Sequence, residues 1–422
     1  MKLGRTAAVA ATFALSACFL TACAEDDGGS AEAATGEGLP VGASMEEYQD
    51  ALADMDPITL NAQTPAAEGS DISALYENYF DRVTEWSDGK IKFNVSYAYA
   101  IAGALDQDNA IQDGRLDIGF TSPVFEPDQY PANAALADST FIGSQSPIIG
   151  LIQTHGAWND AAFGSDQVTQ ELEDQGMHVL LPAFFGGPSG IFCAEPRRTA
   201  DELAGQQTVV SGRVQAAELE ALGATPATFD FTEVYEALQR GAADCALNSM
   251  RVTVLAGLAE VVPYATFDDE AGFAQTPAPW VINKSVWDGL PLVAQQLLFD
   301  QMSGFLLDNL NGVAKFLTDG VAAVEAAGGD IAGLDDASRE ALQSANEKEL
   351  ENIRSSAALE DGAGFVDALE SGSEAWTEKA AELGYDQVGW ADFAEWAANN
   401  EIDFQPFVDS FFEEVMVPNR PS

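Results

Sequence analysis

The chain has 422 residues, of which 47% are apolar, so it is long enough for two or three domains and can bury a sizeable hydrophobic core. Its 68 Asp and Glu residues far outnumber its 18 Lys and Arg residues, which gives a formal net charge of −50. A surface this acidic repels phosphate backbones and anionic lipid headgroups, so the composition excludes nucleic-acid binding and basic docking to a membrane.

The N-terminal residues have the features of a secretory signal. A basic start precedes an uncharged stretch, residues 7–20, which suits the hydrophobic region of a signal peptide and is too short to span a bilayer. This stretch leads into LTAC at 20–23, a pattern typical of a bacterial lipobox, in which the Cys23 thiol would carry the lipid. The alternative is an ordinary signal peptide followed by an incidental cysteine. We therefore predict a signal peptide over residues 1–22 and an extracytoplasmic bacterial lipoprotein, held at the cell membrane through Cys23 alone.

The predicted elements begin after an acidic, Gly- and Ala-rich segment, which we assign to a flexible tether over residues 23–55. Helix and strand patterns then alternate, with helices expected at residues 72–86 and 104–112 and strands at residues 58–62, 91–97 and 116–120. Strands separated by single helices and short turns predict βαβ units and a largely parallel sheet.

The same alternation resumes at residue 177 and continues to residue 247. Helices are expected near residues 213–222 and 232–240, and strands near residues 177–181, 190–194, 207–211, 225–229 and 243–247. Residues 291–327 are compatible with one helix of roughly 50 Å, which is long enough to cross two domains. Beyond it, the pattern of residues 335–422 predicts several amphipathic helices.

Sequence motifs of the common enzyme classes are absent. The chain contains no phosphate-binding G-x-x-x-x-G-K-[ST], no serine-hydrolase G-x-S-x-G and no zinc-protease H-E-x-x-H. We expect its two histidines, His155 and His178, to be structural. The acidic stretch at 106–109 has Ile111 where the turn of an EF-hand loop requires glycine. We therefore expect no catalytic residues, no metal and no cofactor.

Two cysteines remain once Cys18 and Cys23 are assigned to the signal peptide and the lipid. Cys193 and Cys245 both fall in predicted strands of the same domain. Outside the cytoplasm such a pair can be oxidised, so the sequence allows either a disulfide or two buried thiols. Neither cysteine has a histidine nearby in sequence, which argues against a nucleophilic role.

The most informative segment lies between residues 201 and 250. It contains DELAG at 201–205, LGATP at 222–226, FTEVYEALQRG at 231–241 and ADCALN at 243–248. Two further motifs in the N-terminal third are SDGKI at 87–91 and IQDGRLDIG at 111–119. In these motifs the chain resembles the solute-binding proteins of TRAP transporters, the DctP-type family, over residues 57–330.

The resemblance implies an α/β, two-lobe clamshell of the periplasmic-binding-protein type, with a long helix spanning both lobes. Residues 56–185, completed by 274–313, would form lobe I, and residues 186–273, completed by 314–345, would form lobe II. The remaining residues, 346–422, would be a helical C-terminal extension. A small organic solute, either an organic acid or a polar neutral compound, would bind in the cleft between the lobes and pass to integral-membrane TRAP permease subunits.

The resemblance also suggests ligand-binding residues. Asn248 stands at the position of the family's ligand-contacting asparagine, and Phe231 matches a cleft aromatic; the structural alternatives are a turn residue and a core residue. The arginine that grips the ligand carboxylate in most of the family is replaced by Thr208, and residues 184–190 supply no second cation. Either Arg213 has taken over this role, or the ligand has no carboxylate and is held by Ser189, Thr208, Asn248 and backbone N–H groups.

Three further residues are candidates for the cleft. Gln63 and Ser122 follow predicted strands, and ligands bind at the carboxyl ends of strands in open α/β sheets. Trp280 would add an aromatic wall. Two other hypotheses stay open for the whole protein: a solute receptor of an ABC-type transporter or of a sensor, and a secreted lipoprotein enzyme that acts on small metabolites.

Overall fold

The computed structural model describes residues 37–229 and 233–422. The predicted signal peptide, Cys23 and Phe231 lie outside these residues, so their expected roles stay predictions. In the described part of the chain, no helix combines the length and the apolar character that crossing a membrane requires. We call the part built on strands β1 to β4 and β10 lobe I, and the part built on the remaining six strands lobe II.

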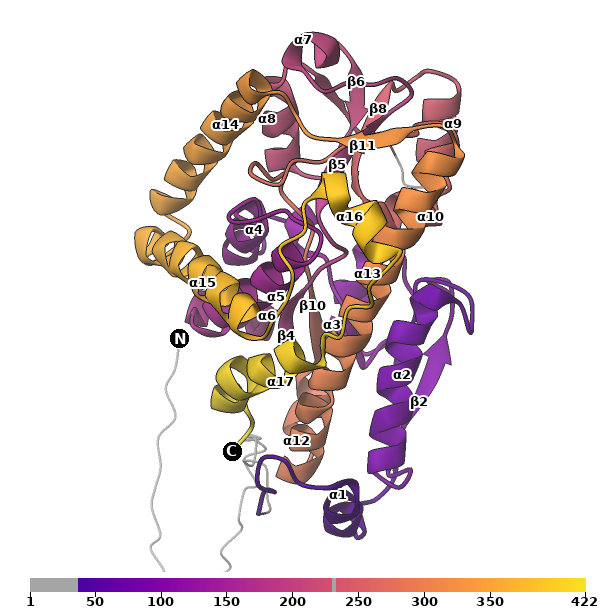
Figure 1. The fold of residues 1–422 in the computed structure, drawn as a ribbon. Coiled ribbons are helices and arrows are strands. Elements are labelled where there is room, and N and C mark those ends of the chain that lie inside the picture. Colours follow the sequence, from indigo (N-terminus) through magenta and orange to yellow (C-terminus); the bar gives the residue numbers. More distant parts are fainter. Residues whose placement is uncertain (1–36, 230–232) are drawn as a thin grey trace, which may run out of the picture. The chain divides into compact units, whose positions relative to one another are not determined.

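Lobe I contains two small sheets (Figure 1). Strands β1 (Ile58–Gln63) and β2 (Ile91–Ser96) pair in parallel, whereas β10 (Ala278–Asn283) lies antiparallel between β3 (Ile118–Phe120) and β4 (Met177–Phe184). Helix α2 (Asp71–Trp86) buries the apolar face that its spacing predicts. The other α-helices of this lobe are α1 (Met45–Leu52), α3 (Gln107–Gln112), α4 (Pro131–Asp138), α5 (Ile149–Phe163), α6 (Asp166–Asp174), α11 (Lys284–Asp288) and α12 (Leu292–Asp300).

Lobe II is built on one six-stranded sheet, with the strand order β11-β9-β5-β8-β6-β7. Its strands are β5 (Ser189–Cys193), β6 (Gln207–Val209), β7 (Thr225–Ala227), β8 (Cys245–Ser249), β9 (Tyr264–Thr266) and β11 (Asp330–Ala332). The helices around it are α7 (Ala200–Leu203), α8 (Arg213–Ala221), α9 (Val234–Gln239) and α10 (Met250–Leu255).

The prediction of a largely parallel sheet is confirmed in lobe II, where five of the six strands run in one direction, but one strand in each lobe is reversed. In lobe II, β5 runs antiparallel to both of its neighbours, and in lobe I, β10 does the same. Both strands follow crossings from one lobe to the other, β5 after β4 and β10 after β9. The alternation of helix and strand describes neighbours in sequence, and it therefore does not determine the direction of a strand that enters from the other lobe.

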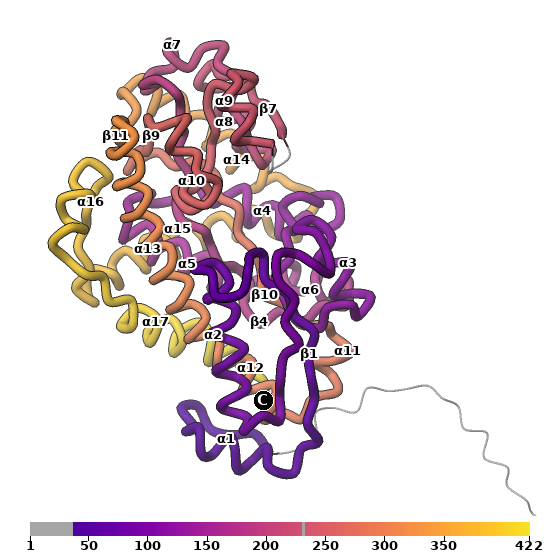
Figure 2. Tube along the Cα trace, turned by 90° about the vertical axis from the view of Figure 1, so that its right-hand side faces the viewer, coloured from indigo at the N-terminus to yellow at the C-terminus, as the bar shows by residue number. Residues whose placement is uncertain are grey.

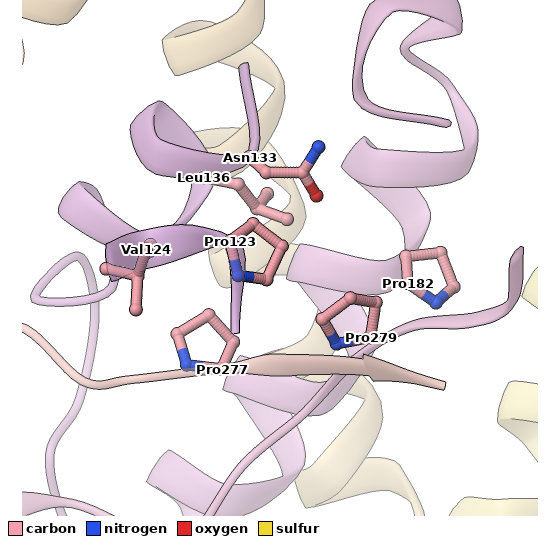
Figure 3. A pocket seen from close by; sticks show the side chains of 8 residues that line it. Pro123, Val124, Asn133, Leu136, Pro182, Pro277 and Pro279 are labelled. Atoms are coloured by element: carbon pink, nitrogen blue, oxygen red, sulfur yellow. The ribbon is translucent and has the colours of Figure 1, made fainter. Parts of the chain in front are cut away.

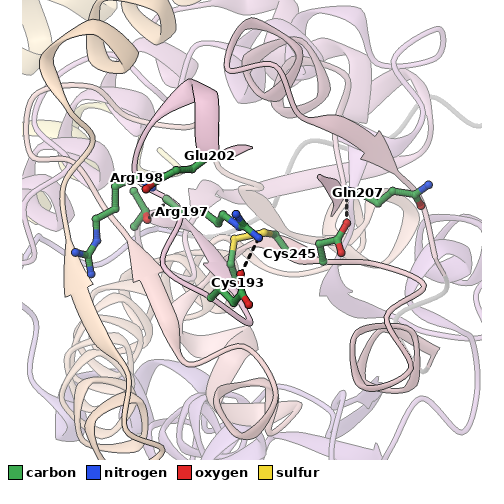
Figure 4. Close-up of a disulfide and its surroundings, with 9 residues drawn as sticks. Cys193, Arg197, Arg198, Glu202, Gln207 and Cys245 are labelled. Carbon is green, nitrogen blue, oxygen red and sulfur yellow. Dashed lines mark hydrogen bonds and ion pairs between the residues drawn. A yellow bond between two sulfur atoms is a disulfide. The ribbon is translucent and has the colours of Figure 1, made fainter. Parts of the chain in front are cut away.

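Cys193 and Cys245 form a disulfide that joins neighbouring strands β5 and β8 (Figure 4). The sequence left open whether these cysteines are bonded. They stand opposite each other in the antiparallel register, and both are buried in the core of lobe II. The bond closes a loop of 52 residues, which constrains the unfolded chain.

The predicted long helix is divided in two. Helix α12 ends before Gln301, and α13 (Met302–Ala326) continues after it. Helix α13 has 25 residues and so extends about 37 Å; it packs against α2 and β4 of lobe I and against α10 and β11 of lobe II. Figure 2 shows α13 passing α2 on its way between the lobes.

The C-terminal segment consists of four α-helices that contact both lobes. Helix α14 (Asp336–Arg354) packs against α8 of lobe II, α15 (Gly362–Glu382) packs against α5 of lobe I, and α16 (Trp390–Ala397) and α17 (Gln405–Phe411) pack against α13. The Trp390 ring stacks on Phe267 with centroids 4.0 Å apart, and its indole N–H donates to the Gln145 carbonyl at 2.9 Å. The extension is therefore part of the folded core.

Helix α1 lies within the range that the sequence analysis assigned to the tether. It begins with a capping box, in which the Ser44 and Glu47 side chains each accept the other's backbone N–H. Its residues Tyr48 and Leu52 are buried, and the Tyr48 hydroxyl donates to Asp300 at 2.6 Å. Folded structure thus begins before residue 55.

Candidate functional site

The carboxyl end of β8 brings predicted ligand residues together. In the register of the sheet, Asn248 stands opposite Gly190 and Ser249 stands opposite Ser189, so Ser189 and Asn248 lie one step apart on neighbouring strands. The chain then enters α10, whose N-cap is Ser249. Arg251 follows in the first turn and therefore lies at the same edge of the sheet as Asn248.

A pocket of about 230 Å³ opens beside Arg251. Lobe I contributes residues of α2, lobe II contributes Arg251, and α13 passes between them; the lining includes Asp71, Leu75, Asn78, Asp308, Asn309, Lys315 and Phe316. The guanidinium carbon of Arg251 lies 5.7 Å from the centre of the Phe316 ring, which is within cation–π range. The buried side-chain oxygen of Asn309 has no hydrogen-bond partner among the described residues.

Two tyrosines of lobe I stand near Arg251. Burial raises the pKa of the Tyr76 phenol, and the Arg251 guanidinium opposes this rise. Burial also raises the pKa of Tyr99. Tyr76 adds to this rise, and the Arg251 guanidinium reduces it. Both phenols therefore stay protonated at neutral pH and can donate O–H hydrogen bonds.

The backbone around Tyr99 is strained. Ala98 and Tyr99 adopt φ values of 53° and 54°, in the left-handed region that side chains other than glycine rarely occupy. Gln63 holds this loop, because its side-chain oxygen accepts the Ile101 and Ala102 N–H groups and its amide donates to the Ala102 carbonyl. Strain that the surroundings maintain is common at ligand sites. Gln63, a predicted ligand residue, thus positions the Tyr99 loop.

Aromatic rings pack behind the two phenols. The Tyr76 ring lies 5.5 Å from Trp280 and 5.9 Å from Phe120, and Tyr99 lies 6.4 Å from Phe120. Trp280, another predicted ligand residue, is fully buried in this cluster. This aromatic packing holds the rings of Tyr76 and Tyr99 in place within lobe I.

Arg251 differs from the other arginines in its charge environment. Among the described residues, every other arginine pairs with an Asp or Glu carboxylate, and none pairs with Arg251. The Lys315 ammonium in the same pocket lies 3.3 Å from Asp71, and the Asp308 carboxylate lies 2.6 Å from Arg82. In a chain with a net charge of −50, a cation without such a partner is suited to bind an anion.

Arg213 already has two carboxylate partners. Its guanidinium lies 2.7 Å from Asp138 of α4 and 3.0 Å from Glu349 of α14. Arg213 is not among the residues that line the pocket at Arg251. Its predicted role as the cation for the ligand stays a prediction.

Thr208 and Ser122 also lie away from this pocket. Thr208 pairs with Cys245 in the sheet, three residues before Asn248, which is about 10 Å along the strand. Its hydroxyl is buried and has no hydrogen-bond partner among the described residues. Ser122 precedes a short 3₁₀ turn (Pro123–Phe125), and its carbonyl accepts the Phe125 N–H at 3.1 Å.

A second, much smaller pocket of about 10 Å³ lies where four prolines meet, Pro123, Pro182, Pro277 and Pro279 (Figure 3). Its polar side chain, Asn133, already donates to the Val168 carbonyl and to the Glu171 carboxylate, both at 2.9 Å. With no charged residue in its lining, this pocket suits an anionic solute less well than the pocket at Arg251.

Residues 62–356 match the family model described as bacterial extracellular solute-binding protein, family 7. The chain belongs to this family. Its match to the C4-dicarboxylate-binding periplasmic protein of Rhodobacter capsulatus has 34% identity over 149 residues, which covers 34% of this chain and 42% of that relative. A solute-binding protein of Albidiferax ferrireducens is 21% identical over 309 residues, covering 70% of this chain and 88% of the relative.

Solved structures of TRAP solute-binding proteins share the fold. A marine-metagenome protein specific for aromatic acids, in complex with metahydroxyphenylacetate, superposes with a TM-score of 0.65 at 22% identity, covering 76% of this chain and 99% of that one. The ectoine-binding protein of Halomonas elongata superposes with a TM-score of 0.64 at 20% identity, covering 75% and 100%. The family match ends at residue 356, so most of the C-terminal extension lies beyond it.

Arg251 is not among the ligand-binding residues predicted from the sequence. Its position was visible, because it follows the motif asparagine by three residues and is one of only 18 basic residues in the chain. What the sequence lacked was the contact information that distinguishes Arg251 from the paired arginines.

Proposed function

We propose that this protein captures a small organic solute between its two lobes, outside the cytoplasm, and delivers it to the integral-membrane subunits of a TRAP-type transporter. The lipid on Cys23 would hold it at the membrane. Family membership supports solute binding, and the relatives named above support solutes that range from organic acids to ectoine.

One observation carries this proposal: groups from both lobes converge on one pocket. Arg251 comes from lobe II, Leu75, Asn78 and the other lining residues of α2 come from lobe I, and α13 contacts both lobes. A ligand that touches both lobes favours the conformation in which they are closed together, and a transporter can recognise that conformation. Binding followed by release needs no catalytic group.

The histidines favour binding over catalysis. His155 is fully buried, its Nδ1 lies 2.8 Å from the Leu151 carbonyl, and burial lowers its pKa to about 4. Its Nε2 lies 3.3 Å from the Phe185 backbone nitrogen, which donates to it. His178 pairs with Glu173 and stacks on Trp287 at 4.1 Å. Both side chains are engaged in packing and hydrogen bonding, as a structural role requires.

Thermal unfolding with and without solutes tests the proposal. The protein lacking residues 1–23 would be heated with organic acids and with their amide or alcohol counterparts. A ligand at 100 times its dissociation constant adds roughly 2.7 kcal/mol to the free energy of unfolding, so a true ligand raises the melting temperature clearly. Ligand recovered unchanged after incubation supports binding, whereas a new product would favour the enzyme hypothesis. A broad panel without any shift would contradict solute capture.

A further inference from the structure

We propose that helices α14 to α17 form a strap that holds the two lobes in the arrangement described here before any solute binds. The proposed function requires only that the lobes can close on a solute, so the strap goes beyond it. The family match covers residues 62–356 and ends before α15 begins. Helices α15, α16 and α17 therefore lie outside the part of the chain that the family model describes.

Helix α14 attaches the strap to lobe II. The Arg339 guanidinium lies 2.9 Å from the carboxylate of Asp268, which is 4% exposed, and the Asn346 amide donates to the Gly272 carbonyl at 2.9 Å. Asp268 and Gly272 belong to the segment that leaves β9 and crosses back to lobe I. Breaking this ion pair would leave a buried carboxylate without its cation, which is strongly unfavourable. Helix α14 therefore stays on lobe II when the lobes move.

Helix α15 attaches the strap to lobe I. The side-chain amide of Gln153 in α5 donates to the Ser373 carbonyl at 2.8 Å, in a buried position. In the same helix, Gly156 faces the Trp376 ring so closely that a Cβ at this position would lie 2.3 Å from the ring. Because glycine has no Cβ, the two helices can approach each other here, and the buried contact fixes α15 to lobe I.

Trp390, at the start of α16, contacts both lobes with one side chain. Its ring stacks on Phe267 of lobe II with centroids 4.0 Å apart, and its indole N–H donates to the Gln145 carbonyl of lobe I at 2.9 Å. Its backbone N–H donates to the Asp269 carboxylate at 3.2 Å. Trp390 is buried, so moving the lobes apart here would leave either the ring or the indole N–H without its partner.

The attachments to the two lobes are joined to each other. Helices α14 and α15 are connected by the short segment 355–361, and the Arg354 guanidinium at the end of α14 lies 2.8 Å from the Glu370 carboxylate of α15. A clamshell protein opens by rotating one lobe relative to the other about a hinge. Because α14 follows lobe II and α15 follows lobe I, such a rotation would strain this connection. The strap should therefore restrict the rotation.

The strap leaves the pocket at Arg251 accessible. The residues that line this pocket come from α2, α10 and α13. Figure 1 shows α14 and α15 on the left of the view, and α2 and α10 on the right. A solute can thus reach the pocket while the strap holds the lobes together. Because the lobes are already in place, less of the binding free energy would be spent on closing them.

Distances between spin labels on the two lobes, measured without any solute, test the strap. The protein lacking residues 1–23 would carry Asp81→Cys on α2 and Glu220→Cys on α8, both at exposed positions. These thiols would be the only free ones, because Cys193 and Cys245 are bonded to each other. We expect one narrow distribution of label-to-label distances in electron paramagnetic resonance. A broad distribution, or two populations, in the protein with an intact strap would overturn the proposal.

Variants then loosen the strap. Trp390→Ala removes the contact with both lobes, and Gly156→Ala pushes the Trp376 ring away from α5. Each variant should lose the single narrow distribution and show a broader or a second population of distances. The control is Trp396→Ala in the same helix as Trp390, since the Trp396 indole N–H donates to Asp386 within the extension at 2.9 Å. This control should keep the narrow distribution. Circular dichroism establishes that each variant is folded.

A narrow distribution in both folded variants would show that the extension adds stability without holding the lobes, and would overturn the strap. If Trp390→Ala did not fold, Trp390→Phe would replace it, because this variant keeps a ring on Phe267 and loses only the N–H bond to Gln145. Failure of the strap and failure of the proposed function are distinguishable. The thermal panel reports whether a solute binds, whereas the label distances are measured in the absence of solute.

Discussion

Arg213 on α8 and Asp138 on α4 form an ion pair with a distance of 2.7 Å, and this pair joins lobe II to lobe I. Glu349 of the C-terminal extension completes the group at 3.0 Å from the same guanidinium. The Asp138 and Glu349 side chains are 16% and 11% exposed, whereas that of Arg213 is 60% exposed. One cation thus connects both lobes and the extension.

Replacing this cation should destabilise the protein. Arg213→Met leaves two mostly buried carboxylates without a partner, and the exposure of Arg213 limits the effect through solvent screening. We expect a loss of about 1–2 kcal/mol in the free energy of unfolding, measured with urea. Arg240→Met, whose pair with Glu236 is exposed, should change it by less than about 0.5 kcal/mol. Equal losses in the free energy of unfolding for the two variants would show that the ion pairs of Arg213 stabilise the protein no more than an exposed pair does.

Glu218 should make stability depend on pH. This fully buried carboxyl accepts the Ala274 N–H, and burial raises its pKa well above the ordinary value, with Asp138 and Glu349 adding to the rise. Between the pKa of the unfolded chain and this raised value, the folded protein binds more protons, so its stability falls as pH rises. Glu218→Gln does not titrate and can still accept the Ala274 N–H.

The comparison is urea unfolding at pH 4, 5.5 and 7. The stabilising effect of Glu218→Gln should be small at pH 4 and should grow toward pH 7. Glu220→Gln on the exposed side of α8 provides the matched control, with no such trend expected. A constant difference between Glu218→Gln and the unmodified protein across this range would mean that folding does not raise the pKa of Glu218.

The Cys193–Cys245 disulfide should contribute to stability through the 52-residue loop that it closes. The loop-entropy relation predicts that the double substitution Cys193→Ala and Cys245→Ala lowers the free energy of unfolding by about 4 kcal/mol. A reductant should lower the stability of the unmodified protein and leave the double variant unchanged. Sensitivity of the double variant to the reductant would indicate that the effect has another source.

Contact between α5 and α15 can be tested at Gly156. A Cβ at this position would lie 2.3 Å from the Trp376 ring, so Gly156→Ala must push the extension away from lobe I. We expect a loss of about 1–3 kcal/mol in thermal or urea unfolding. Gly312→Ala in α13 meets no atom within 4 Å and should be neutral or stabilise the helix by up to about 1 kcal/mol. A neutral Gly156→Ala would mean that the extension is attached only loosely.

Local elements were largely predictable from the sequence. The spacing of apolar residues in α2 and the alternation in β2 reflect which side of each element faces the core, and this information is contained in a short stretch of chain. Cys193 and Cys245 were expected in two strands of the same domain, yet their bond depends on the antiparallel register of β5 and β8. That register follows from the crossing between the lobes, which no local pattern describes.

The candidate site was predictable only in part. The motif around Asn248 indicates the carboxyl end of β8, and the register of the sheet places Ser189 one step away from Asn248. Thr208 lies about three residues deeper along the sheet, and Arg213 is engaged with Asp138 and Glu349. The sequence could not distinguish Arg213 from Arg251, because both follow a strand and begin a helix.

The sequence by itself determined the acidic composition, the order of helices and strands and the family motifs, since each depends on residue type and short-range spacing. The tertiary structure decided which charges meet. Arg213 pairs with residues 75 and 136 positions away, whereas Arg251 receives no carboxylate from the described chain. Pairing depends on distances between groups that folding brings together from separate elements. That is why the arginine suited to bind a ligand emerged only from the fold.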